Sequence, residues 1–136
     1  MKKLIYIFLI NIFITNNSSA LIEVDITRGN LDPLQIAVSP LHVDIKSENY
    51  KDLNVKELGE KISGIIEKNF KNTGLFNPLK KDAFVQKPDI AHLKPRFEDW
   101  RLIKAQALVT GKLLVKDGKL KVEFRLWDLA AAKEMT

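Results

Sequence analysis

The residues of this sequence that could do chemistry are few and scattered. His42 and His92 are 50 residues apart and show no metal-ligand spacing. Ser39 is followed by proline and lacks the glycines that surround a hydrolase nucleophile. The sequence also contains no glycine-rich phosphate-binding loop. We therefore find no reactive constellation, expect no cofactor or metal, and interpret the two histidines as exposed or hydrogen-bonded side chains.

The charge and the cysteine count exclude further classes of function. The sequence has 22 Lys+Arg against 17 Asp+Glu, a formal net charge of +5, and no cysteine. Disulfides and thiolate metal sites are therefore excluded, and so small a net charge gives no argument for nucleic acid. A loose group of basic residues consists of Lys80, Lys81, Lys87, Lys94 and Arg96. We interpret it as solvated, with contact to an anionic surface as the alternative.

The first twenty residues have the three parts of a secretory signal peptide. Two lysines follow Met1, an apolar run of 11 residues spans 4–14 with Asn11 as its one interruption, and a small polar segment ends at Ala20. The run falls well short of the roughly 20 residues needed to span a bilayer. We expect cleavage after Ala20, a periplasmic chain of residues 21–136 (136 − 20 = 116 residues), and no membrane span after cleavage.

The new amino terminus would begin with a short predicted strand. In residues 21–27, Ile22, Val24 and Ile26 share one face and polar side chains occupy the other. Arg28-Gly29-Asn30 forms a turn before the next predicted strand, residues 34–39. The first strand is either a fixed edge strand or a mobile arm that adds itself to the sheet of another protein through backbone hydrogen bonds.

One long amphipathic helix is predicted within residues 53–78. Asn54 as N-cap with Glu57 three residues later makes a capping box, and Gly74 supplies a left-handed residue at the end. Each of the two internal glycines, Gly59 and Gly64, costs roughly 1 kcal/mol relative to alanine. This cost is tolerable where a neighbouring element approaches closely. Apolar residues at three- and four-residue steps predict one buried stripe, made of Val55, Leu58, Ile62, Ile65, Ile66 and Phe70.

The sequence after the long helix predicts its secondary structure less clearly. Residues 75–79 are expected to form a turn with Phe76 buried, residues 84–85 a short strand, and residues 86–95 a surface loop. Pro95 can open a short second helix, with Phe97, Trp100 and Ile103 on one face.

The clearest strand signal lies in residues 105–128. Asp117-Gly118 predicts a two-residue type I′ hairpin turn. This loop pairs Val115 with Leu120, Leu113 with Val122, Gly111 with Phe124 and Val109 with Leu126, all on one face. Lys112 meets Glu123 on the other face, where Trp127 either covers the sheet or contacts a partner.

The order of these elements predicts the fold class. We expect an α/β fold, a two-layer sandwich in which a mixed β-sheet of about four to five strands carries two helices packed on one face. Residues 130–136 look like the start of a further strand, which leaves the last strand as an exposed edge.

Four stretches together resemble the amino-terminal domain of the TolB family, the periplasmic component of the Tol-Pal envelope system. They cover nearly all of residues 21–136 in the family's order. The stretches are IEVDITRG at 22–29 with IAVSP at 36–40, IIEKNFKNTGLFNP at 65–78, Trp100 with ALVTG at 107–111, and the Asp117-Gly118 turn with FRLWD at 124–128. The resemblance implies that residues 21–136 form such a domain and that the β-propeller that follows it in the family is absent.

The resemblance also implies a function. It indicates a non-enzymatic adaptor that helps to maintain outer-membrane integrity and constriction during cell division. By this resemblance the mature amino terminus binds the C-terminal domain of a TolA-like partner, which favours the mobile arm. The corresponding residues are Leu21, Ile22, Glu23, Val24, Asp25, Ile26, Thr27 and Arg28. Binding of the lipoprotein Pal is expected only if a propeller is supplied elsewhere, and neither nucleic acid nor a small-molecule substrate is expected.

Two alternatives stay open from the sequence. The chain could be a truncated, non-functional remnant, or the accessory domain of a periplasmic enzyme. A coil-like circular dichroism spectrum would indicate the remnant, and a clustered Ser/His/Asp site would indicate the enzyme.

Overall fold

The computed structural model describes residues 32–135. The expected signal peptide and the segment 21–28 lie outside this part of the chain. The elements in chain order are β1 (Leu34–Val38), β2 (His42–Val43), α2 (Val55–Asn72), β3 (Phe76–Pro78), the 3-10 turn η1 (Lys81–Ala83), α3 (Pro88–Ala91), α4 (Phe97–Leu102), β4 (Ala107–Lys116), β5 (Lys119–Asp128) and β6 (Lys133–Glu134).

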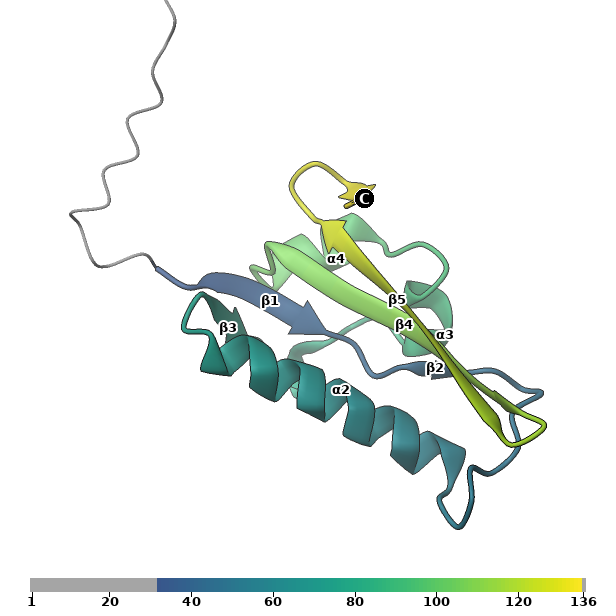
Figure 1. Cartoon of the computed structure of the whole chain (residues 1–136). Helices are drawn as coiled ribbons and strands as arrows, with labels where there is room; N and C mark the ends of the chain where they lie inside the picture. The colour runs from purple at the N-terminus through teal and green to yellow at the C-terminus, as the bar shows by residue number, and fades with distance from the viewer. Residues whose placement is uncertain (1–31, 136) are drawn as a thin grey trace, which may run out of the picture. The chain divides into compact units, whose positions relative to one another are not determined.

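The strands form one mixed sheet (Figure 1) in the order β3-β1-β4-β5-β6, and β2 also pairs with β4. β1 runs parallel to both β3 and β4, whereas β5 is antiparallel to β4 and β6 is antiparallel to β5. The predicted α/β class and mixed sheet are confirmed. The expected further strand is β6, which pairs only with Trp127 and Asp128 of β5.

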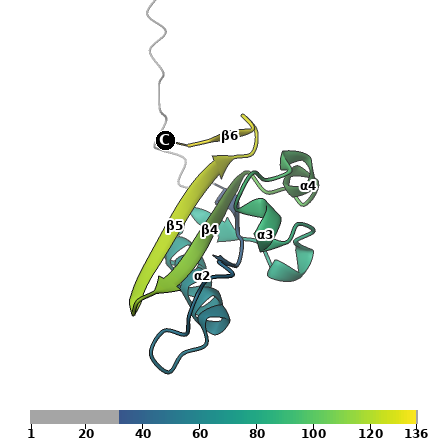
Figure 2. The same cartoon turned by 90° about the vertical axis from the view of Figure 1, so that its right-hand side faces the viewer.

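Both faces of the sheet are covered. Ile36 and Val38 pack with Ile66 and Phe70 of α2, so the long helix and the sheet form the two main layers. The other face contributes Ala37, Leu108 and Trp127 to a cluster around the fully buried Trp100 of α4. The short second helix was expected beside the long one, but it packs on the opposite side of β4 and β5 (Figure 2). The reason is that β1 and β4 also carry buried apolar residues on this second face, Ala37 and Leu108, which require a cover of their own.

The long helix has the predicted N-cap and the predicted glycine after its end, but its apolar stripe is narrower than expected. The capping box is wrong, because among the described residues Asn54 bonds to Lys56 and makes no hydrogen bond with Glu57. The Asn54 side chain accepts a hydrogen bond from the Lys56 backbone N–H at 2.9 Å, and Gly74 has φ +72°. Ile65 is 60% exposed, whereas Ile66 packs on the sheet. Successive helix residues are about 100° apart, so these two cannot face the same strand. The end of the helix is closed by Phe76 against Phe70, ring centroids 4.8 Å apart, and Leu75 is exposed.

A one-residue bulge joins β1 to β2 along β4. Val38 lies opposite Val109 and His42 opposite Lys112, so four steps on one strand match three on the other. Leu41 inside this bulge packs over Gly111, where an added Cβ would lie 2.5 Å from Leu41 Cδ2 and 2.6 Å from the Glu123 carbonyl oxygen.

The bulge is also bonded to α2. The Leu41 N–H donates to the buried Ser63 Oγ at 3.1 Å, and the Ser63 hydroxyl donates to the Gly59 carbonyl oxygen at 2.9 Å. A Cβ at Gly59 would contact Leu41 and Val43, so the expected close approach is confirmed there. It is wrong at Gly64, where a Cβ would meet nothing within 4 Å.

The hairpin has the predicted register. Asp117 and Gly118 have φ of 51° and 67°, as a type I′ turn requires. All four apolar pairs form as expected, and Lys112 lies opposite Glu123. Trp127 is 6% exposed and donates from Nε1 to Thr110 Oγ1 at 2.8 Å, so it covers the second face of the sheet.

Residues 76–95 differ most from expectation. Phe76–Pro78 is a strand rather than a turn, and Phe76 is only partly buried. The expected strand at 84–85 is absent; Phe84 instead packs edge-on against Trp100, ring centroids 5.0 Å apart. The expected surface loop contains α3 and the buried Gln86, which accepts the Trp100 indole N–H at 2.9 Å. A buried indole N–H needs such an acceptor, and local periodicity carries no sign of it.

The second helix begins at Phe97 with Arg96 as N-cap, so Pro95 is not its first residue.

Two glycine-to-alanine substitutions should have opposite effects. Gly111→Ala should lower the free energy of unfolding by about 1–3 kcal/mol, because the new methyl group meets the backbone of β5 and Leu41. Gly64→Ala should raise it by up to about 1 kcal/mol, because the position is helical and open. Denaturant melts of both variants would measure this difference, and an unchanged midpoint for Gly111→Ala would contradict the packing described here.

Candidate functional site

The predicted partner-binding segment, residues 21–28, lies outside the described residues, so its side chains remain unplaced. The chain enters the described part at Asp32 and runs directly into β1. β1 is paired on both sides, by β3 and by β4. β1 therefore has no free edge for the preceding segment to join.

The free edge of β3 is also a poor acceptor for another strand. This strand has three residues, and its last residue, Pro78, has no N–H to donate. β5 is open over most of its length, since β6 covers only its end. Charged residues occupy every second position of that open part, namely Lys119, Lys121, Glu123 and Arg125. Charged side chains of this kind are typical of edges that do not pair with other chains.

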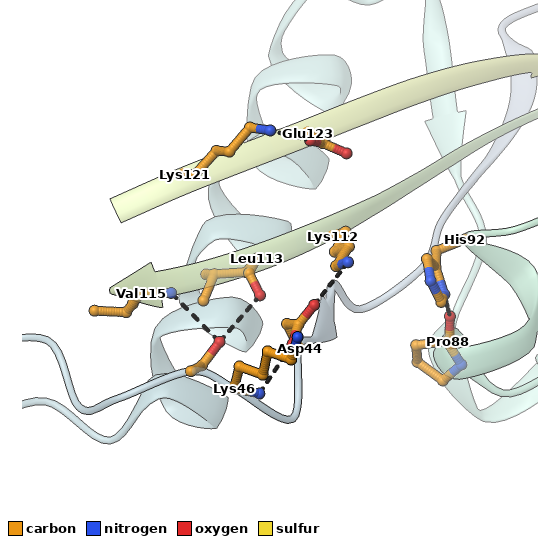
Figure 3. Close-up of polar contacts among 10 residues, drawn as sticks. Asp44, Lys46, Pro88, His92, Lys112, Leu113, Val115, Lys121 and Glu123 are labelled. Atoms are coloured by element: carbon orange, nitrogen blue, oxygen red, sulfur yellow. Dashed lines mark hydrogen bonds and ion pairs between the residues drawn. The ribbon is translucent and has the colours of Figure 1, made fainter. Parts of the chain in front are cut away.

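One ion pair ties the loop after β2 to β4, and a second ion pair lies within β5 (Figure 3). Lys112 Nζ lies 2.7 Å from the Asp44 carboxylate, and Lys121 Nζ lies 2.6 Å from that of Glu123. The hydrogen bond from Lys112 lowers the pKa of Asp44, and the same bond raises the pKa of Lys112. A hydrogen bond from Lys121 lowers the pKa of Glu123. Carboxylates held ionised at the surface in this way are poorly suited to act as general acids.

The two histidines, which the sequence analysis treated as separate, lie together. His42 of β2 stacks on His92 at the end of α3, with ring centroids 4.0 Å apart and planes 3° from parallel. His92 Nδ1 lies 3.0 Å from the Pro88 carbonyl oxygen (Figure 3), which assigns the Nδ1 proton to this bond. No sequence signal predicts the stack, because the fold brings together residues from distant elements.

Within residues 32–135 no three His, Cys, Asp or Glu side chains are grouped as ligands. Burial lowers the pKa of His42 from its ordinary value of 6.5, and the positive charges of His92 and Lys112 lower it further, whereas Asp89 and Asp44 act in the opposite direction. The pair is therefore a structural contact that favours a neutral imidazole.

An apolar cleft of about 460 Å³ opens between α2 and β5. Its walls include Ile66, Phe70 and Phe124, of which Phe124 is 49% exposed. Exposed apolar surface rimmed by polar residues is typical of protein–protein contact. The sequence analysis missed it because it placed Phe124 only as the cross-strand partner of Gly111.

None of the helices in residues 32–135 is long and apolar enough to cross a membrane.

Comparison with known proteins defines the family. The model of the TolB amino-terminal domain matches residues 22–135, and this chain belongs to that family. A curated relative, the Tol-Pal system protein TolB of Pelagibacter ubique (strain HTCC1062), is 62% identical over 132 residues, which cover 96% of this chain and 30% of the relative. The chain thus spans about a third of the length of that relative.

A solved structure has the same fold. The crystal structure of TolB from Acinetobacter baumannii superposes with a TM-score of 0.55 at 16% sequence identity, and the match covers 76% of this chain and 22% of the other.

The histidine stack should make stability depend on pH. Because the pKa of His42 is lower in the folded state than in the unfolded chain, its contribution is present above about pH 6.5 and is lost as the pH falls through the folded pKa. The melting temperature should therefore fall between about pH 7.5 and about pH 5.5, above the range in which carboxylates titrate.

His92→Phe keeps a ring against His42 but removes the positive charge that helps to lower the pKa of His42, so it should make this pH dependence shallower. Thermal melts followed by circular dichroism would measure both proteins across this range. An identical slope for the variant would show that the stack does not contribute.

Proposed function

We propose that this chain acts in the Tol-Pal system of the cell envelope as a periplasmic adaptor and not as an enzyme. The observation that carries the proposal is the 62% identity to a Tol-Pal system protein over 96% of this chain. In this role it binds a TolA-like C-terminal domain and helps to maintain the outer membrane and its constriction during division. Because the match covers 30% of the relative, contact with Pal is proposed only where a propeller domain is supplied.

The proposed contact is made by Leu21 to Arg28. Ile22, Val24 and Ile26 alternate with polar residues, so a strand of this sequence offers one apolar face and a ladder of backbone donors and acceptors. β-strand addition gives affinity through main-chain bonds and specificity through the side chains that enter pockets of the partner.

The folded body of the domain, residues 32–135, supports a contact that is made by the segment before it. β1 is flanked on both sides, and the outer edge of β3 ends in a proline. The body thus forms its sheet without a further strand on β1. The half-exposed Phe124 in the apolar cleft further fits a domain that contacts other proteins.

Deletion of residues 21–28 should abolish capture of a TolA-like C-terminal domain and leave the melting temperature nearly unchanged, because β1 has both of its strand partners without this segment. A pull-down with the exported protein, together with a circular dichroism melt, measures both quantities. Full capture by the deletion variant would place the contact elsewhere.

A pair of variants tests separately what the apolar and the polar face of residues 21–28 contribute to binding of the partner. Val24→Asp interrupts the apolar face and should strongly reduce capture, whereas Thr27→Ser on the polar face should preserve it. Equal capture by both variants would contradict recognition through the apolar face.

A further inference from the structure

A separate cleft lies where the turn after β1 meets the segment between β3 and α3. It encloses about 330 Å³ and is lined by Pro40, Lys81, Phe84, Val85, Gln86, Lys87 and Pro88. Pro40 follows the carboxyl end of β1, and Lys81 follows the carboxyl end of β3. These strands are adjacent and parallel. Crevices outside the carboxyl ends of parallel strands are where ligands bind in open α/β sheets.

Gln86 of this cleft has a hydrogen-bond donor without a partner. The side chain is 4% exposed, and its Oε1 accepts from the Arg96 N–H at 3.0 Å and from the Trp100 indole at 2.9 Å. Because both neighbours are donors, the amide can have only one orientation, with Nε2 on the other side. Within the described residues Nε2 is buried without an acceptor. An unsatisfied buried donor costs about 1–3 kcal/mol, which a bound acceptor would recover.

The lining has positive charge and apolar walls but no carboxylate. Lys87 makes no ion pair within residues 32–135, and Lys81 lies 3.5 Å from Glu67 in a partly exposed pair. Val85 is 60% exposed at the edge of the cleft. An anion held by exposed lysines alone gains little. The favoured occupant therefore combines an acceptor, a negative charge and apolar groups.

We propose that this cleft is a second contact site of the domain and binds an acidic peptide segment of a partner protein. A carboxylate of the peptide is held by Lys87, with Lys81 beside it. An acceptor of the peptide takes the Gln86 Nε2–H once the side chains that cover this buried atom move aside. Apolar side chains of the peptide pack on Phe84, Val85 and Pro40. This site belongs to the folded body and does not depend on residues 21–28.

The test uses the full chain and a fluorescent, end-capped peptide of alternating valine and glutamate. Fluorescence anisotropy should show saturable binding that weakens with added salt, and amide shift changes in a 15N spectrum should concentrate in residues 84–88. The same peptide with glutamine in place of glutamate, and acetate alone, should both bind at least about tenfold more weakly, since each lacks one of the two required groups.

Two variants and a control locate the site. Lys87→Glu should weaken binding about tenfold, whereas Lys116→Glu, a charge reversal at another exposed lysine at the end of β4, should leave it unchanged. Gln86→Glu keeps the acceptor for Arg96 and Trp100 but replaces the donor, so it should also weaken binding; a melt of this variant verifies its fold. Absent saturation, equal weakening by Lys87→Glu and Lys116→Glu, or equal affinity for the glutamine peptide would each overturn the proposal.

Discussion

The packing of Leu41 over Gly111 is the contact on which the rest of the domain depends. One extra residue between β1 and β2 directs the Leu41 side chain onto β4, where the lack of a Cβ at Gly111 leaves the only space for it. The same residue donates its N–H to Ser63 of α2. A single bulge therefore aligns two short strands on β4 and attaches the long helix to the sheet. Buried hydrogen bonds and close contacts of this kind specify one arrangement, because a shifted register would leave the donor unpaired.

A second set of stabilising contacts is made by the indole rings of Trp100 and Trp127. Trp127 bonds to Thr110 within the sheet, and Trp100 bonds to Gln86 across the loop before α3. Each bond satisfies a buried donor. The bond between Trp100 and Gln86 also joins α4 to the segment before α3 on the face of the sheet that α2 does not cover. The short helices are too short to be stable on their own. Their position depends on these aromatic contacts, including Phe97 against Trp127 with ring centroids 5.9 Å apart.

Residues 32–135 present an apolar cleft and a strand edge lined by charged side chains. Their resolved pKa shifts are explained by surface ion pairs and by the histidine stack. The family of the chain and the alternation of residues 21–27 support a function carried by an added strand. The body then provides the attachment for that strand and, as proposed above, a second site for an acidic segment at the ends of β1 and β3.

Much of the fold is determined by local sequence. The caps of α2, the register of the hairpin and the faces of β1 and β4 follow from spacing, because capping, turn chemistry and strand alternation act over a few residues. The family could also be recognised from short motifs. The structure leaves the predicted binding segment unplaced, so residues 21–28 are still a prediction from sequence.

Other features depended on contacts between distant residues. The stacking of His42 on His92, the burial of Gln86 beneath Trp100 and the exposure of Ile65 have no local pattern. The same is true of the position of α4. Ala37 and Leu108 on the face opposite α2 need a cover, but only the packing around Trp100 decides which element supplies it. A sequence reports which residues are apolar or can form hydrogen bonds, but partners separated by tens of residues are chosen only when the whole chain packs.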